Sequence, residues 1–108
     1  AAAAMREAYV NRARRVVSAL SGLPGVACRM PQAGMFVVAD IRGTGLSGTA
    51  FANRLLDEAG VAVMPGESFG DAFNGWIRLS LTAPDDAIDR ALDRVVAFAG
   101  RLAPRKSA

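Results

Sequence analysis

One arginine in the sequence has a position in which its side chain could bind a carboxylate. Arg78 lies in the middle of Gly75–Leu81, a run with the strict alternation of a half-buried strand. Successive side chains point to opposite faces, so Arg78 lies on the face opposite Ile77, Leu79 and Leu81. A guanidinium fixed in this way can hold a carboxylate by two parallel hydrogen bonds. The alternative is an exposed arginine that pairs with an acidic neighbour, and the spacing alone favours this ion pair because such pairs are common.

A glycine motif in the first half of the chain has the pattern of a dinucleotide-binding turn. Gly43–Gly48 fits G-x-G-x-x-G, lies between an expected strand and an expected helix, and is followed nineteen residues later by Glu67. A dinucleotide fold needs further β-α-β units, however, and the residues after 61–64 predict a loop and an edge-like strand. Ser47 inside the motif is also a good helix cap. Dinucleotide binding is therefore the weaker interpretation of this motif, and a loop that leads into a capped helix is the stronger one.

A second glycine motif has the pattern of a nucleophile elbow. Gly66–Gly70 fits G-x-S-x-G, which requires a strand that runs directly into a helix, and a histidine partner for the serine. Pro65 interrupts the strand, and the sequence contains no histidine. We reject the elbow and expect a mobile glycine-rich loop.

The residues that are missing exclude several kinds of chemistry. Without histidine there is no Ser-His-Asp or Cys-His catalysis, and we expect no metal site. The single lysine, Lys106, lies in the terminal segment 103–108, where it cannot serve Schiff-base chemistry that needs a pocket. The single cysteine, Cys28, allows no internal disulfide, reads as a small buried hydrophobe, and fits a cytoplasmic protein.

The charge balance is mildly basic. Thirteen basic and ten acidic residues give a net charge of +3. Arg12, Arg14 and Arg15 are close in sequence, but a helix spreads them around its circumference, and no aromatic residues interleave with them. Nucleic-acid binding stays an alternative that we do not expect. We expect no membrane contact either, because the apolar runs are far too short to span a bilayer.

The expected elements follow the order α-β-β-α-β-β-α. They cover residues 1–20, 26–30, 35–41, 47–59, 61–64, 75–81 and a last helix from Pro84 to Leu102. The buried stripe of the last helix consists of Ile88, Ala91, Leu92, Val95, Ala99 and Leu102. This order predicts an α+β fold, a small two-layer domain with helices on one face of a mostly antiparallel sheet. The first helix lacks a start signal, as if it continued from an earlier segment.

Five segments keep a common order and spacing along nearly the whole chain. They are Met5–Tyr9 with Arg14 and Arg15, Pro31–Phe36, Leu55–Gly66, Phe69–Gly70 and Trp76–Ser80. Together they resemble the C-terminal small domain of the fold-type-I, pyridoxal-phosphate-dependent aminotransferases, the aspartate aminotransferase-like class I/II group. The resemblance implies that the parent enzyme moves an amino group from an amino acid to a 2-oxo acid.

The resemblance also implies roles for particular residues. Arg78 matches the arginine that binds the α-carboxylate of the substrate, and Gly34 and Phe36 match residues near the substrate. It implies no catalytic or cofactor-binding residue here, because Lys106 does not match the cofactor lysine. Pyridoxal phosphate would bind the full-length enzyme and not this fragment alone, which we expect to be inactive.

The resemblance implies a division of the chain as well. Residues 1–22 would be the C-terminal part of the interdomain helix, 23–102 the small domain and 103–108 a flexible tail. The partners would be the missing large domain of the same chain and a second subunit in a homodimer. The alternative function is a free-standing or regulator-linked module that binds a carboxylate ligand without catalysis.

Overall fold

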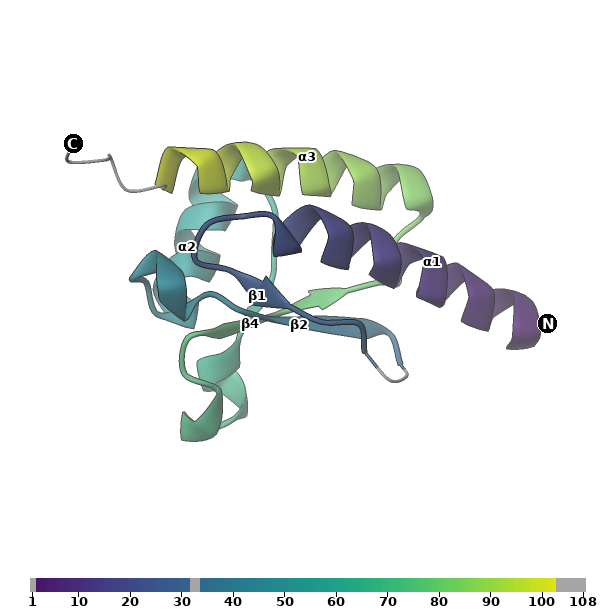
Figure 1. The fold of residues 1–108 in the computed structure, drawn as a ribbon, viewed down its shortest axis with the longest axis horizontal. Coiled ribbons are helices and arrows are strands. Elements are labelled where there is room, and N and C mark those ends of the chain that lie inside the picture. The colour runs from purple at the N-terminus through teal and green to yellow at the C-terminus, as the bar shows by residue number, and fades with distance from the viewer. Residues whose placement is uncertain (1, 32–33, 103–108) are drawn as a thin grey trace.

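The computed structural model describes residues 2–31 and 34–102 (Figure 1). The helices of this part are α1 (Ala2–Ser21), α2 (Gly48–Ala59) and α3 (Asp85–Leu102). The strands are β1 (Ala27–Cys28), β2 (Phe36–Asp40), β3 (Met64–Pro65) and β4 (Trp76–Ser80). Short 3-10 turns lie at η1 (Arg42–Thr44), η2 (Gly66–Phe69) and η3 (Asp71–Phe73). The expected order of helices and strands is confirmed; the proposed tail 103–108 lies outside the described residues.

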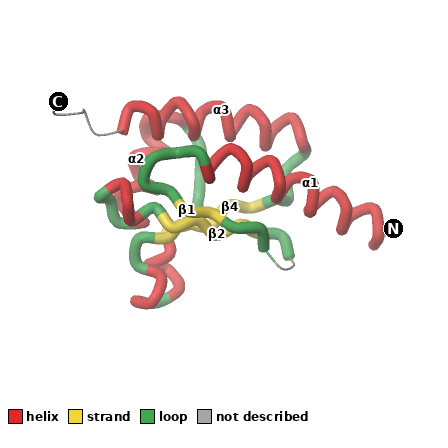
Figure 2. Tube along the Cα trace, viewed as in Figure 1, coloured by secondary structure: helices red, strands yellow, loops and turns green. Residues whose placement is uncertain are grey.

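The four strands form one sheet in the order β1-β2-β4-β3, and every neighbouring pair is antiparallel. The central pair sets Val38 opposite Arg78, and β3 sets Met64 against Arg78 from the other side. Helices α1 and α3 lie over one side of the sheet, and η2 and η3 lie on the other (Figures 1 and 2). The α+β, two-layer expectation is therefore correct.

The core lies between the helices and one face of the sheet. Val37 and Ala39 of β2 and Ile77 of β4 are fully buried there, as the alternation predicted. On α3 the side chains of Ile88, Leu92, Val95 and Ala99 are buried, while Ala91 and Leu102 are only partly buried. The expected stripe omitted Phe98, whose fully buried ring meets Phe51 edge-on, with ring centroids 5.4 Å apart.

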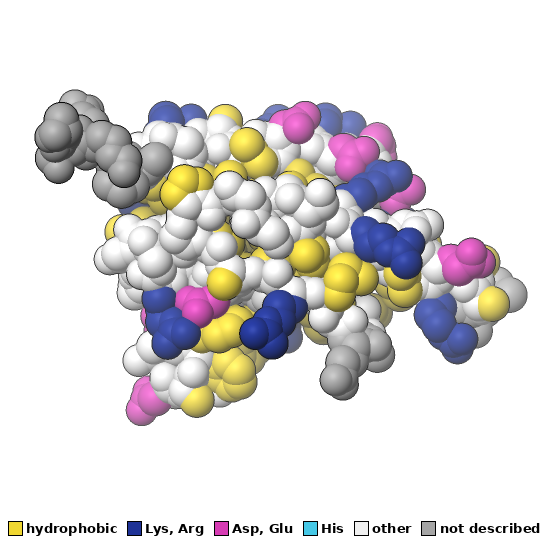
Figure 3. All heavy atoms as spheres, in the orientation of Figure 1, with side chains coloured by type: hydrophobic (Ala, Val, Ile, Leu, Met, Phe, Trp, Pro, Cys, Tyr) yellow, Lys and Arg dark blue, Asp and Glu magenta, His cyan; other side chains and the backbone are white. Residues whose placement is uncertain are grey.

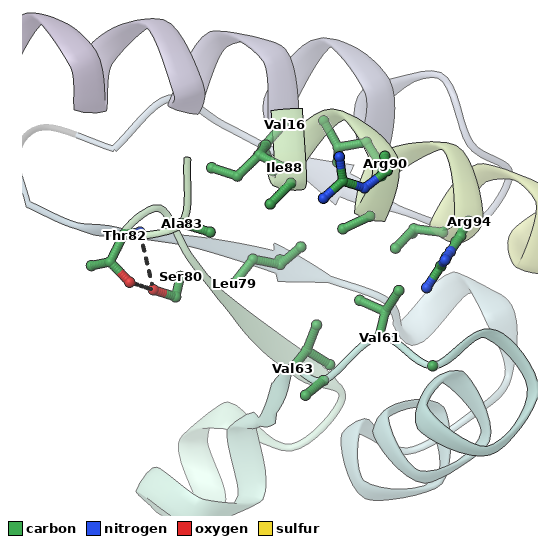
Figure 4. Close-up of a pocket in the computed structure, with 16 residues that line it drawn as sticks. Val16, Val61, Val63, Leu79, Ser80, Thr82, Ala83, Ile88, Arg90 and Arg94 are labelled. Carbon is green, nitrogen blue, oxygen red and sulfur yellow. Dashed lines mark hydrogen bonds between the residues drawn. The ribbon is translucent and has the colours of Figure 1, made fainter. Parts of the chain in front are cut away.

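The strand expected over 61–64 is largely wrong, because pairing with β4 begins only at Met64. Val61 and Val63 instead pack against the core. They border a pocket of about 400 Å³ between this segment, β4 and α3, into which Leu79 and Ile88 also point (Figure 4). Apolar contact with the helix layer thus replaces ladder hydrogen bonds over 61–63.

Local signals fix the ends of α2. The hydroxyl of Ser47 accepts a hydrogen bond from the N–H of Ala50 at 3.0 Å, and Gly60 ends the helix in the left-handed region with φ 70°. Both features confirm the sequence expectations.

Two further expectations concern surface charge and the thiol. Arg12 and Arg15 of α1 pair with Asp85 and Asp89 of α3, so these basic side chains join helices. Partial burial raises the pKa of the Cys28 thiol to about 11, in keeping with a small hydrophobe. Among the described helices, none is long and apolar enough to cross a membrane.

Candidate functional site

The face of the sheet that α1 and α3 leave uncovered carries Arg78 at its centre. The side chains of Phe36 and Val38 on β2 share this face, and Trp76 lies two residues from Arg78 on β4. Arg78 is half-buried, although it lies outside the helix-covered core. The strand therefore holds the guanidinium at a defined place on an otherwise apolar surface.

Two phenylalanine rings contact the guanidinium of Arg78, and we call this pair the aromatic clamp. The Cζ of Arg78 lies 3.9 Å from the ring centroid of Phe36 on β2 and 4.5 Å from that of Phe69 on η2. Both distances are well inside the range of a cation–π contact. The clamp restricts the side chain from two different elements.

The charge of Arg78 has no acidic partner within residues 2–31 and 34–102, and its buried Nε has no hydrogen-bond partner there. Asp40, on β2, binds Arg42 instead, with Oδ1 2.9 Å from Nε and Oδ2 2.6 Å from Nη2. Its hydrogen bond to Arg42 keeps the pKa of Asp40 below the ordinary value. The ion pair that the spacing of Arg78 favoured is thus absent from the described residues.

A pocket of about 260 Å³ opens beside Arg78. Its walls are almost entirely apolar: Val38, Gly66, Phe69, Phe73, Trp76, Ile77 and Arg78. A guanidinium in apolar surroundings binds an anion more strongly than one in open water, because the local dielectric constant is lower. The arrangement can hold a carboxylate that has an apolar group attached.

The structure brings together two of the three residues expected at the substrate. Phe36 contacts Arg78, as described. Gly34 adopts φ 103° and lines a different pocket, of about 220 Å³, with Tyr9 and Ala13 of α1. Within residues 2–31 and 34–102, Gly34 does not line the pocket that contains Arg78.

Glu67 has a role that the sequence analysis did not identify. Its Oε2 accepts hydrogen bonds from the N–H of Gly48 at 3.0 Å and from the N–H of Gly75 at 3.3 Å. Burial acts to raise the pKa of Glu67, but backbone N–H groups outweigh it and hold the pKa below the ordinary value. The segment expected as a glycine-rich loop forms the two 3-10 turns η2 and η3, and Glu67 ties η2 to α2 and to the residue before β4.

The same contact explains the apparent dinucleotide motif. A dinucleotide would place its pyrophosphate at the N-terminus of the helix, but the Glu67 carboxylate binds the first N–H of α2. Gly43 serves a close approach of two backbones, because a Cβ there would lie 2.5 Å from the Cα of Gly25. The nineteen-residue spacing between Gly48 and Glu67 therefore reflects a tertiary hydrogen bond.

Comparisons with known proteins agree with this fold. The family model "Aminotransferase class I and II" matches residues 1–95. Arginine–pyruvate transaminase AruH of Pseudomonas aeruginosa is 46% identical over 99 residues, which cover 92% of this chain and 25% of that protein. LL-diaminopimelate aminotransferase of Oleidesulfovibrio alaskensis is 36% identical, covering 89% of this chain and 24% of that protein.

Solved structures give the same result. The aromatic aminotransferase from Pyrococcus horikoshii OT3 superposes with a TM-score of 0.83 at 32% identity, covering 90% of this chain and 26% of that one. The chain thus spans about a quarter of the length of the relatives it matches. By its sequence and its fold, the chain belongs to the class I and II aminotransferase family.

Proposed function

We propose that this chain is the C-terminal small domain of a pyridoxal-phosphate-dependent aminotransferase, and that Arg78 binds the α-carboxylate of the substrate. The observation that carries the proposal is the Arg78 guanidinium, clamped by two rings and without an acidic partner among the described residues. Residues 1–22 would be the C-terminal part of the interdomain helix and 23–102 the small domain.

The surface around Arg78 supports an incomplete site. Val38, Met64, Phe69 and Phe73 are each about two-fifths exposed around it. From one side of the molecule, hydrophobic side chains gather below the sheet, next to charged ones (Figure 3). Exposed apolar patches next to a binding residue are typical of interfaces. The remainder of the polypeptide would cover this face, in a homodimeric cytoplasmic enzyme.

The described residues do not fit pyridoxal phosphate. They include no lysine that could bind the cofactor covalently, and Glu67 already occupies the first N–H of α2, where a phosphate could bind. The cofactor supplies the electron sink for amino transfer when it is bound, and the rest of the polypeptide would hold it. This chain contributes binding and orientation of the carboxylate, which positions the substrate for reaction.

Mutation of Arg78 in the full-length protein tests the proposal. Amino donors for the assay are L-arginine, LL-diaminopimelate and L-aspartate, the substrates in the names of the relatives, with pyruvate or 2-oxoglutarate as acceptor. Arg78→Ala should raise KM for the best donor about 100-fold, since charge-assisted hydrogen bonds contribute about 1.5–3 kcal/mol each. The KM of Arg78→Lys should lie between those of Arg78→Ala and the unchanged protein, because the ammonium keeps the charge but cannot form two parallel hydrogen bonds.

The matched control is Arg94→Ala, which removes an exposed arginine on α3. It should leave KM unchanged. A normal KM in Arg78→Ala would refute the proposed role.

The same geometry also supports the second candidate, a carboxylate-binding module without catalysis. Trp76, the only tryptophan, lines the pocket beside Arg78, so its fluorescence can report binding to the 108-residue chain. A saturable change on titration with pyruvate, absent in Arg78→Ala, would support free-standing binding. No response, together with transaminase activity of the full-length protein, would leave only the enzyme.

A further inference from the structure

One carboxylate ties the turn that carries one ring of the aromatic clamp to two other elements. Phe69 ends η2, and Glu67 lies two residues earlier in the same turn. The Glu67 carboxylate binds the N–H of Gly48, where α2 begins, and the N–H of Gly75, directly before β4. Glu67 therefore connects η2 to two elements that are themselves packed into the core.

The packing around η2 leaves little freedom for another arrangement. Gly66, the first residue of η2, is buried, and a Cβ there would overlap the carbonyl oxygen of Phe73 and lie 2.9 Å from the Cβ of Trp76. A Cβ on Gly48 would overlap Oε1 of Glu67. Two glycines thus make room for the carboxylate and for the turn that it holds.

From these contacts we propose that Glu67 is a positioning residue for Arg78: its carboxylate fixes η2, which holds the Phe69 ring against the guanidinium. The inference rests on the proposed function, in which Arg78 binds the substrate carboxylate. Glu67 itself touches neither substrate nor guanidinium among the described contacts, and it acts through Phe69.

The clamp matters because of the geometry of a guanidinium. Its five N–H donors lie in one plane, so a ring against its face leaves the edge free for a carboxylate. Phe36 alone would hold one side, from β2, and Phe69 restricts the side chain from η2. Restricting the side chain before binding reduces the rotamer freedom that is lost when the carboxylate arrives.

The test compares KM and kcat of full-length variants, with the best donor from the assay above. Glu67→Ala and Phe69→Leu should each raise KM about threefold to tenfold, the range expected for loss of a cation–π contact, with kcat little changed. The double variant should show no further increase, because both changes act through the same ring. Glu67→Gln keeps an acceptor oxygen and should restore KM to near the original value, as should Phe69→Tyr, which keeps the ring.

The control for a merely structural role is Ser47→Ala, which removes the other side-chain cap of α2. It should lower thermal stability without raising KM. If Glu67→Ala lowers stability in the same way and leaves KM unchanged, or if the effects of Glu67→Ala and Phe69→Leu are additive, the inference is wrong. If Glu67→Ala fails to fold, an unchanged KM in Phe69→Leu refutes it as well.

The outcomes separate this inference from the proposed function. A normal KM in Arg78→Ala removes the carboxylate-binding role itself. A high KM in Arg78→Ala with normal KM in Glu67→Ala and Phe69→Leu retains that role and rejects only the positioning by Glu67.

Discussion

The side chain of Arg12 connects α1 to α3 and to the residue after β4. Its Nε lies 2.8 Å from Oδ1 of Asp85 on α3, and its Nη1 donates to the carbonyl oxygen of Leu81 at 2.8 Å. Its Cζ also lies 5.8 Å from the centroid of the Tyr9 ring. Because the side chain is only 17% exposed, these contacts are screened less than those of a surface ion pair. Arg12 therefore couples α1, the end of β4 and the start of α3.

Replacement of Arg12 should destabilise the chain. Arg12→Ala leaves a partly buried carbonyl without its donor, and we expect a loss of about 1–3 kcal/mol in the free energy of unfolding. The hydrogen bond from Arg12 is the main cause that keeps the pKa of Asp85 below its ordinary 3.8. That contribution is present above the unfolded pKa and disappears as the pH falls through the lower folded value. Urea unfolding should therefore show that the free energies of unfolding of Arg12→Ala and the unchanged protein differ less at pH 3 than at pH 7.

The control for this prediction is Arg14→Ala, since Arg14 is exposed and forms no ion pair within the described part of the chain. Its stability should match the unchanged protein at both pH values. An Arg12→Ala chain of normal stability at pH 7 would contradict the coupling.

At the scale of elements, the segment after α1 and the segment after β2 meet at two glycines. Gly25 and Gly43 approach so closely that a Cβ on Gly43 would lie 2.5 Å from the Cα of Gly25 and 2.9 Å from its carbonyl carbon. Backbone atoms cannot rotate away as a flexible side chain can. This contact, and not ligand binding, requires the glycine at 43.

Gly43→Ala should therefore destabilise the chain by about 1–3 kcal/mol, as overpacking does. Gly22→Ala is the matched control, because a Cβ there meets nothing within 4 Å. Thermal unfolding followed by circular dichroism checks both variants. Equal unfolding midpoints for Gly43→Ala and Gly22→Ala would show that the backbones at Gly25 and Gly43 can move apart without loss of stability.

Patterns that depend on near neighbours in the sequence predicted these elements well, and tertiary contacts account for the errors. The alternation of β4 and the cap at Ser47 appear in the structure as expected. The expected strand over 61–64 failed because its valines pack towards the helices, which the sequence cannot distinguish from ladder pairing. Phe98 lay at the margin of the apolar stripe, and only its contact with Phe51 reveals its burial.

The candidate site was predictable only in part, for the same reason. Arg78 and Phe36 could be found from strand alternation and family resemblance. Phe69 lies in one of the segments of the resemblance, but its contact with Arg78 and the role of Glu67 could not be found, because both depend on where η2 folds against β4 and α2. The spacing from Gly48 to Glu67 was a real signal, but the sequence offered only a dinucleotide site, already the weaker interpretation, and not the hydrogen bond that the two residues form.

At the scale of the whole molecule, the uncovered face of the sheet should bind a hydrophobic dye. The 108-residue chain should bind a hydrophobic dye such as anilinonaphthalene sulfonate while folded, because Val38, Met64, Phe69 and Phe73 remain exposed around Arg78. Val38→Thr should reduce the dye signal, whereas Val10→Thr on α1, equally exposed, should not. The full-length protein should bind little dye at this face. A folded 108-residue chain without dye binding would contradict an interface here.

The register between β4 and β2 links the stability of the fold to the position of Arg78. A one-residue slip of β4 would turn Arg78 into the helix-covered side and turn Ile77 outwards. The slipped molecule would bury a charge without a partner, so it would unfold rather than persist as an inactive form. Cellular proteases remove such molecules. Under the role proposed for Arg78, quality control of the fold would thereby also remove the molecules that could not bind the substrate carboxylate.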